Sequence, residues 1–192
     1  PGKFMVNAAY NAILAYDEVV KKATTEGKIK TETTNDPEKK LTIHPEKLAL
    51  LEACERYLKY VPNGDKRVEI AYKVAKIYYD YNHLDESTGR FKELALKNKT
   101  YKFENGDKVC VLAGNLALDA HNLRRDFAGI ITWGQKLLDE GACDDKQFAT
   151  DLAVLIPKTI FKRINQLEAN KDYCQAADEY MGFVEKYEKH EL

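Results

Sequence analysis

The sequence is poor in residues that interrupt helices. It has 5 Pro and 10 Gly among 192 residues, a share too low for a collagen-like or a low-complexity disordered chain. The formal net charge is only -1, from 30 Lys and Arg against 31 Asp and Glu. The sequence therefore lacks both the basic excess that is typical of nucleic-acid binding and an acidic tail.

Long apolar runs are also missing. None approaches the roughly 20 residues that a membrane-spanning helix needs, so we expect no direct membrane insertion. Hydrophobic residues make up 44% and charged residues 32%, which favours solvated amphipathic helices over disorder. The chain starts at Pro1 without an initiator Met, which suggests a processed or excised fragment, so we draw nothing from the absence of a signal peptide.

Motifs for catalysis or metal binding are absent as well. The histidines are scattered at His44, His83, His121 and His190, and no His-Glu-x-x-His motif appears. There is no Gly-x-Ser-x-Gly nucleophile, no phosphate-binding Gly loop and no Cys-x-x-Cys pair. We therefore expect a protein that is not an enzyme and that has no cofactor and no metal.

The cysteines are few and far apart. Cys54 and Cys110 fall among helical apolar positions, so we interpret them as small core residues. Cys143 and Cys174 lie near opposite ends of one predicted helix pair. A disulfide between these two needs an oxidising compartment, and the helix between them makes close approach difficult. Their oxidation state stays open.

The segment 68–99 reads as two amphipathic helices joined by a polar break over 81–86. Asn82 and Asp85 favour turn and cap conformations in that break. Apolar and small residues recur at helical spacing on both sides of it. These residues are Ala71, Val74, Ala75 and Tyr78 before the break, and Ser87, Phe91 and Leu94 after it.

Similar periodicity predicts further helices along the chain. Their ranges are 4–22, 45–61, 108–121, 128–140, 146–169 and about 174–187. Asp144 or Asp145 is a candidate N-cap, and Pro157 should kink or split the helix that contains it. Between the first two helices, residues 23–44 are polar. A small hairpin around Asp36 is conceivable there, but a solvated loop is favoured.

The order of small and large residues in 68–99 resembles the tetratricopeptide repeat (TPR) pattern, although Ala71 replaces its Trp and Lys99 its closing Pro. Leu50, Ser87, Ile130 and Ala176 occupy the same phase in four second helices, farther apart than the roughly 34 residues of a standard repeat. The resemblance implies an all-α fold of antiparallel helix hairpins, stacked as a right-handed superhelical solenoid. We predict one domain, 1–192, with units at about 4–62 (including the 23–44 insertion), 66–99, 107–140 and 146–188.

The TPR resemblance also implies a binding surface, because the first helices of such arrays line a concave groove. Tyr72 or Phe161 could instead pack on a neighbouring helix, and Lys76, Asp119 and Glu168 could be ordinary solvated charges. We nevertheless predict that a protein or peptide binds this groove. The candidate residues are Glu69, Tyr72, Lys76, Tyr79, Leu112, Asn115, Asp119, Asn122, Lys158, Phe161, Asn165 and Glu168.

One TPR subclass clamps a C-terminal carboxylate with paired Lys and Asn residues. Lys76, Asn115, Lys158 and Asn165 supply these residue types but not the full pattern at matching offsets, so we do not predict such a clamp. The alternative function is a ligand-sensing regulatory domain that binds a small molecule or a cell-wall fragment. A deep, closed pocket lined by Tyr72, Tyr79 and Asn115 would favour it, whereas an open groove favours a scaffold.

Three stretches, 71–94, 115–127 and 172–187, resemble more closely the large TPR proteins of the deltaproteobacterial cell envelope. These include proteins associated with adventurous gliding motility in myxobacteria. The resemblance implies a scaffold in a multi-protein complex, in the bacterial periplasm or at the outer membrane. A cytoplasmic location stays open. The Lys-rich composition of this chain differs from the Arg-rich composition that is usual for myxobacterial proteins.

Overall fold

The computed structural model describes residues 2–30 and 32–188, and this part of the chain is helical without a regular β-strand. The predicted all-α class is therefore confirmed, and the conceivable hairpin near Asp36 is not formed. An isolated antiparallel β-bridge pairs the backbones of Lys102 and Lys108. The helices are α1 (Lys3–Thr25), α2 (Pro45–Tyr60), α3 (Arg67–Asp80), α4 (Leu84–Lys97), α5 (Val109–Leu123), α6 (Phe127–Asp139), the short 3-10 helix η1 (Ala142–Asp144), α7 (Lys146–Ala169) and α8 (Tyr173–Lys186).

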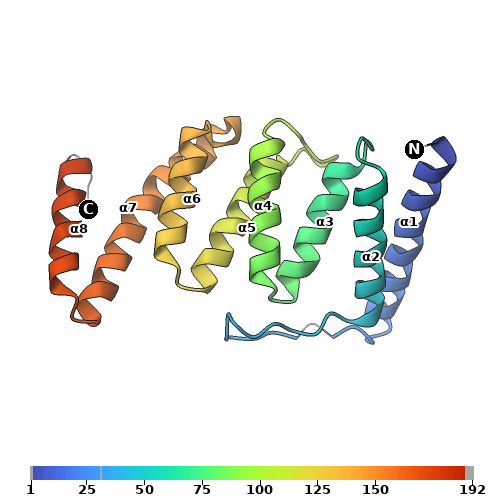
Figure 1. The fold of residues 1–192 in the computed structure, drawn as a ribbon, viewed down its shortest axis with the longest axis horizontal. Helices are drawn as coiled ribbons and strands as arrows, with labels where there is room; N and C mark the ends of the chain where they lie inside the picture. The colour runs from blue at the N-terminus through green and yellow to red at the C-terminus, as the bar shows by residue number, and fades with distance from the viewer. Residues whose placement is uncertain (1, 31, 189–192) are drawn as a thin grey trace.

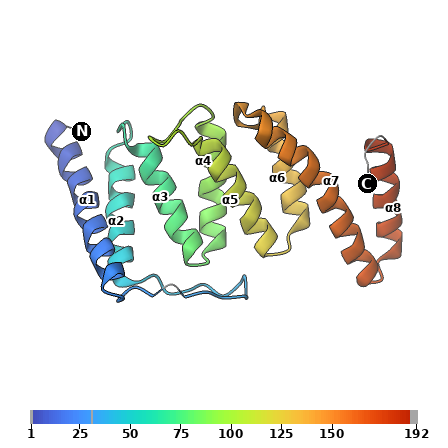
Figure 2. The ribbon, with the colours of Figure 1, turned by 180° about the vertical axis from the view of Figure 1, so that it is seen from behind.

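The helices follow one another along a single axis (Figure 1), and each packs on the next one in the chain. In Figure 1 the even-numbered helices lie nearer the viewer. In Figure 2, which shows the molecule from behind, the odd-numbered helices lie nearer the viewer. Helices α1 and α8 lie at opposite ends of the row. The molecule is thus an elongated row of helices in two layers.

The hydrophobic core consists of two clusters along this row. One joins α1, α2 and α3 around Cys54 and Tyr57, and the other joins α3 to α7 around Phe91 and Trp133. The face of α7 that carries Leu152 lies against Gly134 of the preceding α6. Each helix therefore buries its apolar face by packing on its neighbours.

The observed helix boundaries lie within a few residues of the predicted ones. The break after α3 is shorter than predicted, because α4 begins at Leu84 and takes Asp85 and Glu86 into its first turn, where carboxylates are favourable. Asp145 is the N-cap of α7, with its Oδ1 accepting from the Phe148 amide at 3.0 Å. Pro157 does not split α7, which is one continuous helix.

The connection between α1 and α2 is anchored rather than simply solvated. Residues 36–41, which we call the strap, lie against the turn between α3 and α4. The Asn82 side-chain amide lies within hydrogen-bond distance of three strap carbonyls, at 2.8 to 3.2 Å. Leu41 is buried, its amide donates to the Tyr81 carbonyl at 3.0 Å, and its own carbonyl lies 2.9 Å from Nε2 of His83. The prediction of a solvated loop was therefore wrong for this part.

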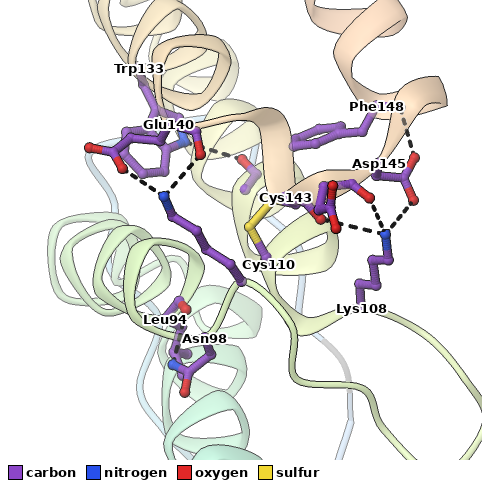
Figure 3. Close-up of a disulfide and its surroundings, with 12 residues drawn as sticks. Leu94, Asn98, Lys108, Cys110, Trp133, Glu140, Cys143, Asp145 and Phe148 are labelled. Atoms are coloured by element: carbon purple, nitrogen blue, oxygen red, sulfur yellow. Dashed lines mark hydrogen bonds and ion pairs between the residues drawn. A yellow bond between two sulfur atoms is a disulfide. The ribbon is translucent and has the colours of Figure 1, made fainter.

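The cysteine pairing also differs from the prediction, because Cys110 is bonded to Cys143 (Figure 3). Cys110 is a buried core residue, as predicted, but it is disulfide-bonded rather than free, and a Cys143–Cys174 bond is not formed. The turn at η1 brings Cys143 to the start of α5, with a Cα–Cα distance of 5.5 Å. Cys174 follows α7, whose 24 residues span about 36 Å. Cys174 is an exposed free thiol, and Cys54 is a buried one as predicted.

Candidate functional site

A cleft of about 780 Å³ lies between α1, α3, α5 and the connection that follows α4. We call it the aromatic cleft. Tyr72 meets Phe103 edge-on, with ring centroids 5.1 Å apart, and lies 5.7 Å from the ring of Phe91. Four predicted site residues line this cleft: Glu69, Tyr72, Lys76 and Leu112.

Charges of both signs surround the aromatic cleft, and many are already paired. Glu69 Oε1 lies 3.1 Å from Lys66 Nζ and accepts from the Tyr101 hydroxyl at 3.0 Å. Lys76 pairs with Asp80 on its own helix. Burial raises the pKa of Tyr72, so its hydroxyl stays protonated at neutral pH. The cleft thus combines an apolar, aromatic interior with a polar rim of low net charge.

A second cleft, of about 400 Å³, lies between α5, α6 and α7. We call it the amide cleft, because the exposed residues Asn115 and Asn122 lie on its α5 side, seven residues apart on one helix face. Asp119 lies between them, and Leu118, Phe127 and Ile130 supply apolar surface. This cleft therefore presents side-chain amides beside an apolar surface.

Tyr79 connects the two clefts. Its hydroxyl donates to the carboxylate of Asp119, which lines the amide cleft. Its ring lies 5.6 Å from Nζ of Lys76, which lines the aromatic cleft. Burial, followed by the Asp119 carboxylate, raises the pKa of Tyr79 far above its ordinary value. The Tyr79 hydroxyl is therefore a constant hydrogen-bond donor.

The predicted row on α7 lies elsewhere. Phe161 packs on α8, with its ring 4.6 Å from Phe183 and 6.1 Å from Tyr180, which is the alternative that we weighed for this residue. Lys158, Asn165 and Glu168 are exposed and do not line the two clefts. The residues of α7 that line the amide cleft are Leu155, Thr159 and Lys162.

The sequence contained a signal for this different face of α7. Leu155 and Thr159 extend the helical phase of the buried Leu152, provided that the helix continues through Pro157. The prediction also missed two other contributors to the aromatic cleft, Tyr10 of α1 and Phe103. Tyr101 and Phe103 precede the Asn-Gly turn at 105–106, which was the local signal for that wall.

No metal centre accompanies the clefts. Within residues 2–30 and 32–188, no group of three or more His, Cys, Asp or Glu side chains could hold a metal ion. His121 instead contacts Asp126, the N-cap of α6, with Nδ1 2.7 Å from Oδ2. His190 lies outside the described residues.

The chain matches no family model, and no curated protein or solved structure is significantly similar to it. Among the described helices, none is long and apolar enough to cross a membrane. The functional interpretation therefore rests on the geometry of the two clefts.

Proposed function

We propose that the chain is a TPR-like right-handed solenoid and a non-catalytic module that binds a peptide or protein segment along its odd-numbered helices. The observation that carries this proposal is the pair of clefts linked by Tyr79 and Asp119. Both clefts involve the odd-numbered helices, as expected for the first helices of such repeats. The alternation of odd and even helices in two layers supports the repeat arrangement (Figures 1 and 2).

The two clefts offer complementary chemistry to one extended segment. The aromatic cleft fits an apolar or aromatic side chain, because Tyr72 and Phe103 supply contact area at low entropic cost. In the amide cleft, Asn115 and Asn122 can each donate to a peptide carbonyl and accept from a peptide N–H. Such groups suit the binding of a polypeptide backbone.

The open form of the clefts favours this function over the sensing of a small molecule. A ligand-sensing domain would need one enclosed pocket that brings Tyr72, Tyr79 and Asn115 together. Tyr72 lines the aromatic cleft, whereas Asn115 lines the amide cleft. A segment that runs from one cleft to the other reaches both residues, and a compact ligand in either cleft does not.

The Cys110–Cys143 disulfide supports a setting in an oxidising compartment, because such bonds are rare in reducing cytosol. We therefore extend the proposal to a scaffold in a bacterial envelope complex, in the periplasm or at the outer membrane. The disulfide does not distinguish between these two places.

A pulldown tests the groove with one substitution in each cleft. The variant Leu112→Glu plus Asn115→Ala adds a charge to the aromatic cleft and removes an amide from the amide cleft. The matched control, Val154→Glu plus Asn165→Ala, makes the same changes at exposed positions of α7 outside both clefts. Circular dichroism verifies that both variants are folded.

We expect the groove variant to recover at least about tenfold less partner from native lysate than the control, which corresponds to about 1.4 kcal/mol of binding energy. Equal recovery of the same partners by both variants would contradict binding in this groove. The partner identified in this way can then be titrated as a synthetic peptide against the same two variants.

A further inference from the structure

A third cleft, of about 470 Å³, lies between α2, α3 and α4. We call it the cationic cleft. Helices α2 and α4 form its walls, and α3, on which both of them pack, forms its floor (Figure 1). None of its lining residues lines the aromatic cleft or the amide cleft. Its size is typical of sites for small molecules, so it offers a binding site separate from the peptide groove.

Positive charge exceeds negative charge on the lining of this cleft. Two carboxylates, Glu55 and Glu93, face four cationic side chains there. Arg90 pairs with Glu55 at 2.5 Å, and Lys97 pairs with Glu93 at 2.7 Å. The cationic side chains are Lys59, Arg67, Arg90 and Lys97. Two positive charges, those of Lys59 and Arg67, are therefore left without a counter-charge on the walls.

Arg67 is half-buried and oriented by the end of α2. Its Nη1 donates to the Leu58 carbonyl at 2.5 Å. Because a guanidinium has five N–H donors, this bond leaves others for a ligand. Lys59 is exposed next to Leu58, with its amine 5.1 Å from the ring of Tyr60. Within residues 2–30 and 32–188, neither Lys59 nor Arg67 forms an ion pair.

The surface beside these two charges is apolar. Val68 and Ala71 of α3 lie there, together with Leu58 of α2 and Leu94 of α4. Leu58, Val68 and Ala71 are partly exposed, so a hydrocarbon or aromatic group can bury them further. The cleft therefore combines a cationic side with an apolar floor.

A tryptophan occupies the corresponding space farther along the row. Arg90 follows the buried Ser87 of α4 by three residues, as Trp133 follows the buried Ile130 of α6. Trp133 is 3% exposed, and the Lys92 amine of α4 lies 5.3 Å from its ring. The large ring thus fills the space between α4 and α6, whereas the charged Arg90 borders an open cleft between α2 and α4.

We propose that the cationic cleft binds a small organic phosphate monoester, with its phosphate on Arg67 and Lys59 and its apolar group on the α3 floor. Such a phosphate carries close to two negative charges at neutral pH, which match the two cations that lack a counter-charge. Guanidinium groups bind phosphate oxygens through paired N–H donors. A carboxylate would neutralise only one of the two cations.

An NMR titration with four probes tests the chemistry of the site. Phenyl phosphate has both required groups, inorganic phosphate lacks the apolar group, benzoate carries a single charge, and phenylmethanol carries none. At one ionic strength, we expect phenyl phosphate to bind at least about fivefold more tightly than each of the other three. Its amide shifts should be largest at Leu58, Val68 and Leu94, which line the cleft.

Substitution of the two cations tests their role. Lys59→Gln plus Arg67→Gln should weaken the binding of phenyl phosphate by at least about tenfold. Lys59→Glu alone leaves the bond between Arg67 and Leu58 in place and should weaken binding by at least about threefold, because it reverses one charge. The matched control, Arg56→Gln plus Lys158→Gln, makes the same charge change at exposed positions outside the cleft and should bind like the wild type. Circular dichroism verifies that all three are folded.

The peptide-groove variant separates this site from the proposed function. Leu112→Glu plus Asn115→Ala should bind phenyl phosphate like the wild type, because neither residue lines the cationic cleft. The proposal is overturned if phenyl phosphate does not bind, or if any of the other probes binds as tightly. It is also overturned if the shifts are confined to the other two clefts, or if the matched control loses as much affinity as the double variant.

Discussion

The side-chain amine of Lys108 lies 2.6 Å from the carbonyl oxygen of Asp144, across the turn that carries Cys143. Residues 141–144 all have positive φ, between 42° and 86°, and three of them are not glycine. This conformation is costly for residues with a Cβ atom. Lys108 and the Cys110–Cys143 bond hold the turn against α5, as Figure 3 shows.

The disulfide should therefore contribute strongly to stability. We expect Cys143→Ser to lower the free energy of unfolding by about 3–4 kcal/mol, because the bond closes a long loop in the unfolded chain and also holds the left-handed turn. Urea denaturation measures the change. Cys174→Ser removes an exposed free thiol and should leave stability within about 0.5 kcal/mol of the wild type.

Thiol labelling should distinguish the cysteines before any substitution is made. In the native oxidised protein only Cys174 should react rapidly, since Cys54 is buried and burial raises the pKa of its thiol to about 12. Denaturation should expose the second thiol, and reduction should add the remaining two. If all four cysteines reacted in the denatured, unreduced protein, the disulfide assignment would be wrong.

Asn82 should control the attachment of the strap. Its φ of 58° suits Asn or Gly, so Asn82→Gly keeps the backbone and removes only the side-chain amide. We expect a loss of about 1 kcal/mol and roughly fivefold to tenfold faster hydrogen exchange at the Leu41 amide. Asn105→Gly, in a turn away from the strap, should not change that exchange rate. An unchanged Leu41 rate in Asn82→Gly would show that the amide does not hold the strap.

The free energy of unfolding should fall when the solution is acidified below pH 7. Burial lowers the pKa of His121 below its ordinary value and outweighs the raising effect of Asp126, while Lys92 and Arg124 add to the lowering. The unfolded chain then binds the proton more readily, so stability decreases as the pH falls through about 6.5. His121→Gln, whose amide can still donate to Asp126, should flatten this part of the pH profile. Parallel profiles for the two proteins would contradict the assignment.

Two helical glycines should respond in opposite ways to an added methyl group. At Gly134 a Cβ atom would lie 3.1 Å from Cγ1 of Ile156, between α6 and α7, so Gly134→Ala should destabilise the protein by about 1–2 kcal/mol. Gly182 lies in α8 with no atom within 4 Å of such a Cβ. Gly182→Ala should therefore stabilise the protein by about 0.5–1 kcal/mol, since alanine has the higher helix propensity. Thermal unfolding of the pair measures both changes.

The helices could be predicted because apolar spacing is a local property of the sequence. Tyr78 and Phe91 indicated the inner faces of α3 and α4 without any knowledge of their neighbours. The disulfide could not be predicted, since the approach of Cys143 to Cys110 depends on a left-handed turn made of residues that rarely adopt it. The position of the strap could not be predicted either. Asn82 donates to backbone carbonyls, which every residue carries, so no residue type in the strap identifies it as the partner.

On α3 and α5 the cleft-lining positions could be predicted because the helical phase there is uninterrupted. Seven of the predicted positions on these two helices line the clefts. On α7 the predicted face lies away from both clefts, and Phe161 packs against Phe183 of α8. The phase of α7 depends on whether the helix continues through Pro157, which the neighbouring helices decide.

The strap also makes the two ends of the row mechanically unequal. In a row where each helix packs on its neighbours, unfolding can proceed one helix at a time from either end. The strap joins the α1–α2 connection to the α3–α4 turn, so α2 cannot detach without breaking the bonds to Asn82 and Tyr81. Helix α8 packs mainly on α7. Under load or heat α8 should unfold early, whereas α2 to α4 should unfold together as one cooperative block.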